Sequence, residues 1–182
     1  MTTPIKSLPA ELGLLKLPLN VEIDFEMTEE TEEWVKNILL EMNENATDKT
    51  PAENLEETYL HISGQMTKKF TSENGEYLLM SVRIQTEYNT ECVRTLKPMS
   101  ESMDLEFNVC FINETLATSE LFAEIDETYL DGAVYEIYFY NKKTANIQEM
   151  VHEQIYLNYN QYPILDAESD IPGAAAEEPT KQ

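Results

Sequence analysis

Two β-patterned runs constrain the fold of this chain more than any other feature of its sequence. From residue 103 to 111 apolar and polar side chains alternate cleanly, and from 77 to 88 an apolar row faces a polar row of Ser81, Arg83 and Gln85. A period of two places alternate residues on opposite faces of a β-strand, and one apolar face per strand is typical of antiparallel sheets. We therefore expect two long strands with an inward row of Leu78, Met80, Val82, Ile84, Met103, Leu105, Phe107, Val109 and Phe111.

Two other segments have the spacing of amphipathic helices. The first follows Thr28 and a run of glutamates that favours the positive end of a helix dipole. The second opens at Asn146, which can cap the helix, with Glu149 completing a capping box. The expected buried stripes are Trp34, Val35, Ile38, Leu39 and Met42 in the first helix, and Ile147, Met150, Val151 and Ile155 in the second.

Turn signals and weaker patterns complete the predicted fold. Asn74-Gly75 and Asp131-Gly132 are typical of hairpin turns. Residues 12–26 alternate loosely and predict an N-terminal strand bent at Pro18, residues 113–128 predict a polar loop, and residues 134–140 predict another strand. The expected fold class is α+β: an antiparallel, strongly curved β-sheet, a meander that could approach a barrel, packed by two amphipathic helices.

Charge sets the expectations about partners and location. The chain has 12 Lys+Arg against 35 Asp+Glu, a net charge of −23, and such a surface repels phosphate backbones. Contact with RNA would be weak or would pass through basic proteins, although the acidity can also serve solubility alone. No long apolar window and no secretory signal are visible, so the expected location is cytoplasmic, away from membranes. Residues 1–165 are expected to form one domain, and 166–182 an acidic disordered tail.

Two short motifs carry a family resemblance. The first spans residues 91–98, where Cys92, Arg94, Leu96 and Pro98 stand between the two alternating runs. The second lies in the last helix and the segment after it, with the residues Val151, Glu153, Ile155, Leu157 and Pro163. Over roughly residues 55 to 165 the chain resembles the YceD family, bacterial and plastid proteins linked to accumulation of large-subunit ribosomal RNA. The resemblance implies a non-enzymatic factor in large-subunit (23S) ribosome biogenesis.

The resemblance also suggests roles for individual residues. Family members carry a C-x-x-C pair that could give half of a zinc site, but here Thr95 stands in place of the second cysteine and no cysteine follows Cys110. We expect no metal and no cofactor, and we interpret Cys110 as an incidental thiol on a polar strand face. Arg94 could bind a phosphate or a partner carboxylate, or it could form an internal ion pair. Glu153 is expected at the edge of the core, and it is a candidate to form an ion pair with Arg94 as an internal brace.

The same features define the functional alternatives. The chain lacks a P-loop, G-x-S-x-G and H-x-x-x-H, which argues against an enzyme. The favoured interpretation is an acidic scaffold that binds a basic ribosomal protein or assembly factor, with RNA contact indirect at most. The alternatives are an acidic adaptor unrelated to ribosomes and a degenerate zinc-binding RNA module. The sequence leaves open the partner, the RNA step and the oligomeric state.

Overall fold

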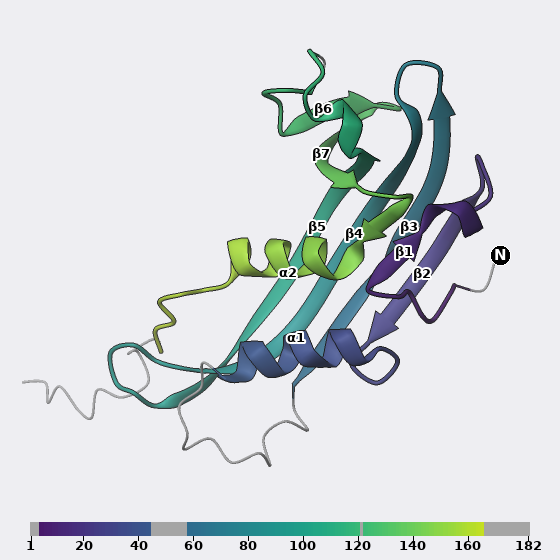
Figure 1. Ribbon diagram of the computed structural model, residues 1–182. Helices are drawn as coiled ribbons and strands as arrows, with labels where there is room; N and C mark the ends of the chain where they lie inside the picture. Colours follow the sequence, from purple (N-terminus) through teal and green to yellow (C-terminus); the bar gives the residue numbers. More distant parts are fainter. Residues whose placement is uncertain (1–3, 45–57, 121, 166–182) are drawn as a thin grey trace, which may run out of the picture.

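The computed structural model describes residues 4–44, 58–120 and 122–165, and its centre is a six-stranded open sheet (Figure 1). In spatial order the strands are β2 (Glu22–Thr28), β3 (Tyr59–Thr71), β4 (Gly75–Glu91), β5 (Pro98–Asn113), β7 (Ala133–Tyr140) and β6 (Glu127–Leu130). A small second sheet pairs β1 (Glu11–Gly13) with β8 (Thr144–Asn146). The helical elements are α1 (Glu33–Glu44), α2 (Ile147–Asn158) and the 3₁₀ turns η1 (Leu14–Lys16) and η3 (Glu114–Leu116).

The two alternating runs form the centre of the sheet, as predicted. β4 and β5 pair antiparallel in a register that sets Met80 opposite Val109 and Ile84 opposite Leu105. Both strands extend beyond the residues predicted for them, so that they reach the two ends of the motif around Cys92. The expected turns also form: Gly75 and both residues of Asp131-Gly132 have positive φ, as tight hairpin turns require.

Both helices pack across one face of this sheet and run side by side toward the turn between β4 and β5 (Figure 1). α1 buries the five residues predicted for it, and α2 buries its predicted four together with Gln154. The Asn146 side chain accepts a bond from the Glu149 N–H at 3.0 Å, which confirms the predicted helix start. The carbonyl of Ala10 accepts the N–H of Ile147 at 2.8 Å, so the N-terminal segment also caps α2.

Within the part of the chain that the structure describes, the other face of the sheet is covered only near one end. There a small second cluster packs, made of Tyr77, Leu79, Cys110, Ile112, Phe122 and Tyr135. The alternation within β5 correctly placed Cys110 on this second face, but the thiol is fully buried rather than incidental. The physical reason is that Phe122 and Tyr135, from segments outside the central strands, cover the end of that face. Burial raises the pKa of Cys110 to about 12.

The α+β class, the two packed helices and a mostly antiparallel sheet are as expected, but the strong curvature and barrel-like form are wrong. β2 and β6 lie at opposite edges and do not pair, so the sheet stays open. β7 also runs parallel to β5, from Val109↔Glu136 to Asn113↔Tyr140. The connection after β5 leads first into β6, and the tight β6–β7 hairpin then places β7 against β5 in the same direction. Alternation reports which face a residue occupies and says nothing about strand direction.

The single bent strand expected over residues 12–26 is replaced by two separate strands. η1 and positive φ at Asn20 interrupt the extended backbone between β1 and β2. The buried ammonium of Lys68 fixes this break, because its Nζ donates to the Leu14 carbonyl at 3.0 Å and lies 3.8 Å from a Glu76 carboxylate oxygen. The expected tail, 166–182, lies outside the described residues. Among the helices that the structure describes, none is long and apolar enough to span a membrane.

Candidate functional site: a groove beside the turn between β4 and β5

The first sequence motif forms a tight turn, residues 92–97, that joins β4 to β5. The Cys92 N–H donates to the Lys97 carbonyl at 3.0 Å, and the Leu96 N–H donates to the Cys92 carbonyl at 2.8 Å. Pro98 is the first residue of β5, a position where its missing N–H and fixed φ are tolerated. The motif therefore builds one compact turn at the end of the long hairpin.

The sulfur of Cys92 is the hydrogen-bond acceptor around which this turn is organised. The Thr95 hydroxyl and the backbone N–H groups of Arg94 and Thr95 donate to it, and so does the Leu165 N–H, at 3.4 Å. These donors favour the thiolate, and they lower the pKa of Cys92 from 9.0 to about 7. Cys92 is shielded from water, and the hydrogen bonds outweigh the desolvation that opposes this shift.

The same turn fastens the segment that follows α2. The Val93 N–H donates to the Pro163 carbonyl at 3.0 Å, beside the bond from Leu165 to Cys92. Tyr159, also after α2, stacks on Tyr88 of β4 with ring centroids 4.9 Å apart. The two motifs of the sequence thus meet in space, and Pro163 is the matched residue of the second motif that makes the contact.

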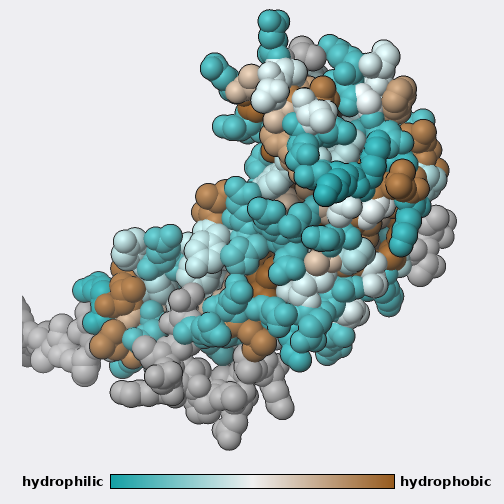
Figure 2. Space-filling view, viewed as in Figure 1, coloured by the Kyte–Doolittle hydropathy of each residue, from teal (hydrophilic) through white to brown (hydrophobic). Residues whose placement is uncertain are grey.

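A groove of about 880 Å³ opens between the ends of the two helices and this turn. α1 contributes Ile38, Glu41, Met42 and Glu44, β4 and the turn contribute Thr90, Glu91, Val93 and Leu96, and α2 with the segment after it contributes His152, Ile155, Tyr156, Tyr159, Asn160, Gln161 and Pro163. Figure 2 shows hydrophobic side chains at the surface of this end, and others along the opposite end, of a largely hydrophilic face. Exposed apolar groups gathered in a concave surface are typical of binding sites.

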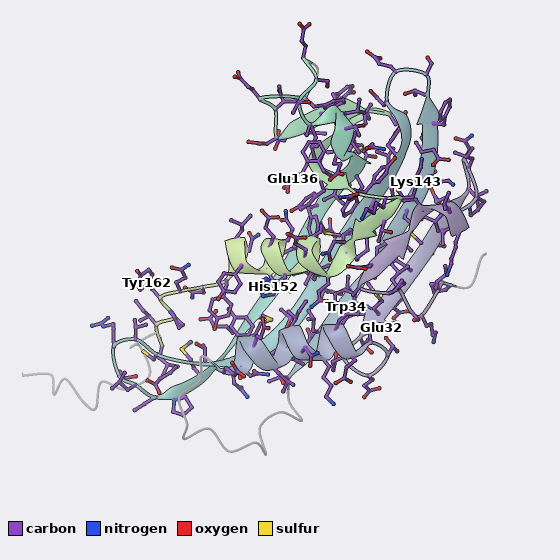
Figure 3. The ribbon with its side chains drawn as sticks, in the orientation of Figure 1. Glu32, Trp34, Glu136, Lys143, His152 and Tyr162 are labelled. Carbon is purple, nitrogen blue, oxygen red and sulfur yellow. The ribbon has the colours of Figure 1, made fainter. Side chains whose placement is uncertain are left out.

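The electrostatics of the groove are negative. Glu41, Glu44 and Glu91 lie along it, and none of the lining residues that the structure describes is a lysine or an arginine. Both helices end here without a basic residue in the last turn, so the negative ends of their dipoles add to the carboxylates. His152 lies between the helices, where its Nε2 is 2.8 Å from Glu41 (Figure 3). The groove suits an occupant with both apolar and cationic groups.

Leu96 has an unusual conformation for its residue type. Its φ is 56°, in the left-handed region that costs an L-residue about 1–2 kcal/mol, and its side chain is 69% exposed at the groove. Glycine would satisfy this backbone without strain. A strained residue that presents an apolar side chain to solvent next to a groove is a candidate for ligand contact.

The structure separates the remaining two motif residues. Arg94 is exposed at the turn, and the ion pairs among the described residues engage the other arginine, Arg83, with Asp104 and Glu106. Glu153 is exposed on α2. Burial raises the pKa of the Tyr138 hydroxyl of β7 to about 12, and the nearby Glu153 carboxylate adds to this shift. The expected brace between Glu153 and Arg94 is therefore wrong. Residues two apart on a helix point in different directions, so Glu153 cannot share the buried face of Val151 and Ile155.

Sequence reasoning did not anticipate the groove as a unit. Its walls come from three segments of the chain, and only the turn and Pro163 carried a recognisable signal. The aromatic pair Tyr156 and Tyr159, spaced by three residues at the end of the last helix, was a usable hint. Within residues 4–44, 58–120 and 122–165, no three histidine, cysteine or acidic side chains lie where they could share a metal ion.

Comparison with known proteins gives one match. A family model described as "Large ribosomal RNA subunit accumulation protein YceD" matches residues 80–182. The match begins within β4 and includes the turn, the segment after α2 and most of the groove, whereas the groove residues of α1 precede it. No curated protein matches, and no solved structure matches.

Proposed function

The chain belongs to the YceD family, and on this premise we propose that it supports the accumulation of large-subunit ribosomal RNA as a non-catalytic, acidic scaffold. Its partner in this proposal is a basic ribosomal protein or assembly factor, and the binding site is the groove beside the turn between β4 and β5. Bound in this way, a basic protein would be kept soluble and available for assembly with its RNA.

One observation carries the proposal: the groove combines exposed apolar side chains with carboxylates and helix C-termini, and its described lining contains no basic residue. Apolar contact supplies affinity, while the negative potential selects a cationic partner and speeds its encounter. Ribosomal proteins as a class must neutralise RNA phosphates, so their binding segments are cationic.

The overall charge supports indirect contact with RNA. At −23 the chain repels a phosphate backbone, and few of its cations are available to release counterions. Arg94 is the exception, because it is exposed beside the groove and forms none of the ion pairs found among the described residues. In this proposal its guanidinium binds a carboxylate of the partner bidentately and fixes the orientation of the bound protein.

The test is co-purification of the full chain after nuclease treatment, compared between two charge-reversed variants. Glu44→Lys places a cation in the groove at the last residue of α1, where the helix dipole favours it. Glu73→Lys makes the same change at an exposed position in the β3–β4 turn. We expect the wild type and Glu73→Lys to retain basic ribosomal proteins without RNA, and Glu44→Lys to lose most of them.

Other outcomes separate the alternatives. If recovery depends on intact RNA, the chain is an RNA module and the scaffold proposal fails. Recovery of nuclease-resistant partners unrelated to ribosomes would instead indicate a general acidic adaptor. Equal loss in both lysine variants would show that overall charge, rather than the groove, governs binding.

A further inference from the structure

We propose that the outer edge of β5 between Pro98 and Asn108 binds an extended, lysine- or arginine-rich segment of a partner protein as an added strand. This inference rests on the proposed function and deepens it, because it specifies the conformation and side-chain pattern of the basic partner. It concerns a surface next to the groove and not the groove itself.

The edge is long and open. On its inner side β5 pairs with β4 along its length, from Pro98↔Glu91 to Phe111↔Leu78. On its outer side β7 pairs with it only from Val109 to Asn113, and no other strand of the described residues continues this ladder. The open stretch accommodates about ten residues at about 3.3 Å each, and its outward N–H and C=O groups form a template for another strand.

The two terminal strands of the sheet, β2 and β6, have shorter or partly covered outer edges. The outer side of β2 is partly covered by the N-terminal segment, since the Ile5 N–H donates to Asp24 at 2.8 Å and the Glu26 N–H donates to Ile5 at 2.9 Å. β6 spans only Glu127–Leu130. Among the described residues, β5 therefore provides the longest open edge, although it lies within the strand order and not at its end.

Charge identifies the occupant. Residues 98–141, which include β5, β6 and β7, contain ten acidic residues and no lysine or arginine. Soluble proteins often protect open strand edges with lysine, whereas this edge carries Glu101, Asp104 and Glu106. Arg83 of β4 pairs with Asp104 and Glu106, but three carboxylates against one arginine keep this edge negative. The remaining charge opposes pairing with a second copy of a chain that bears −23 charges and attracts a cationic strand.

The two faces of β5 specify the side-chain pattern of the added strand. Toward the helices, the half-buried Leu105 and Phe107 continue the apolar row of the core. On the opposite face, Asp104 and Glu106 are exposed. A partner strand with apolar residues at every second position and lysine or arginine between them matches both faces at once.

The edge is also continuous with the groove. The side-chain amide of Asn160, which lines the groove, donates to Glu101 of β5 at 3.3 Å. A basic segment that leaves the groove at Asn160 thus meets the open edge of β5 directly. This continuity explains how one partner chain could occupy both surfaces.

The test uses synthetic peptides and the full chain. The probe is a peptide of about nine alternating lysine and valine residues, long enough to cover the open edge. Two isomers carry N-methyl groups on either the valine or the lysine amides, which point to opposite edges of a strand. We expect one isomer to lose binding by at least about tenfold and the other to bind as the parent does, because only one row of amides faces β5.

Site and charge are checked with two neutralised variants of equal net charge. The first combines Glu101→Gln, Asp104→Asn and Glu106→Gln, and the second makes Glu→Gln changes at the exposed Glu11, Glu22 and Glu73. The first should weaken peptide binding several-fold more than the second, and bound peptide should slow amide hydrogen exchange in residues 99–107.

Equal behaviour of the two N-methyl isomers would overturn the added-strand inference, because simple charge attraction does not depend on which amides are blocked. Protection that appears along β2 or β6 instead of β5 would overturn it as well. Either result leaves the proposed function standing if Glu44→Lys still abolishes capture of ribosomal proteins. If instead the peptide still adds to β5 but the chain retains no ribosomal protein, the proposed function fails and the peptide result stands.

Discussion

The hydroxyl of Thr95 donates a hydrogen bond to the sulfur of Cys92. The turn keeps its shape through hydrogen bonds to one sulfur, assisted by the N–H of Leu165 at 3.4 Å. The pKa of the Cys92 thiol therefore reports whether the hydrogen bonds of this turn are formed.

Removing the hydroxyl should raise that pKa. Thr95→Val removes the hydrogen bond that does most to lower the pKa of Cys92, so the thiol should titrate above 7, closer to its ordinary value of 9.0. Thiolate absorbance at 240 nm measures this step, and Cys110, with its pKa raised to about 12, does not interfere near neutrality. Cys92→Ser serves as the control, because it should lack the step. An unchanged midpoint in Thr95→Val would contradict the hydrogen bond.

The same thiol should make stability depend on pH. The pKa of Cys92 is lowered in the folded protein, so the folded state binds the proton less tightly than the unfolded chain does. This contribution to stability is present above pH 9 and is lost as the pH falls through about 7. The difference in unfolding free energy between the wild type and Cys92→Ser should grow from pH 7 to pH 9, as measured by urea denaturation. A constant difference over that range would rule out the linkage.

Arg94→Ala distinguishes the two roles considered for that arginine. The side chain is exposed and forms none of the described ion pairs, so we expect stability to change by less than about 0.5 kcal/mol. Affinity for the basic partner should fall, because a bidentate contact is removed. Thermal unfolding and partner binding of the same variant decide the matter. A loss of stability that accounts for the whole loss of affinity would mean that Arg94 is an internal brace.

Leu96→Gly should also separate stability from binding. Glycine adopts the φ of 56° without strain, so stability should stay the same or rise by up to about 1 kcal/mol. The exposed side chain of the groove disappears, so partner affinity should decrease. Parallel denaturation and binding measurements test this, and unchanged affinity would exclude Leu96 from the contact surface.

Gly64→Ala should damage the sheet strongly. A Cβ at this position would lie 2.0 Å from the Ser81 carbonyl oxygen and 2.9 Å from Cζ of Phe25, and backbone cannot move aside cheaply. We expect a loss of at least about 3 kcal/mol of stability. Gly13→Ala is the matched control, because nothing lies within 4 Å of the added carbon. Similar unfolding midpoints for the two variants would show that β3 and β4 adjust more easily than their contact distance indicates.

The sequence predicted those parts of the fold that depend on local periodicity. The buried faces of both helices, the alternation of β4 and β5 and the Asn146 cap were read correctly, because each follows from a repeat or a short-range contact. The parallel placement of β7 and the burial of Cys110 were not predicted, because both depend on segments from other parts of the chain that pack against β5.

The candidate site was likewise predictable only where it is built from contiguous residues. The turn around Cys92 was recognisable from contiguous residues, and Pro163 was recognised with it. The groove depends on the end of α1, whose glutamates resemble any solvated helix face when read in sequence. The contact between Glu153 and Tyr138 could not be predicted from the sequence either, because only the fold brings α2 against β7.

The pairing of β1 with β8 constrains the order in which this protein can fold during its synthesis. Leu12 lies opposite Ala145, and the carbonyl of Ala10 caps the start of α2, so a segment from near the beginning of the described chain joins one from near its end. Contacts of such high sequence separation form late and slow the folding of a domain. While the chain is still being translated, β1 has no strand to pair with until residues 144–147 have emerged from the ribosome. The pairing of β1 with β8 therefore waits until residues 144–147 have been synthesised.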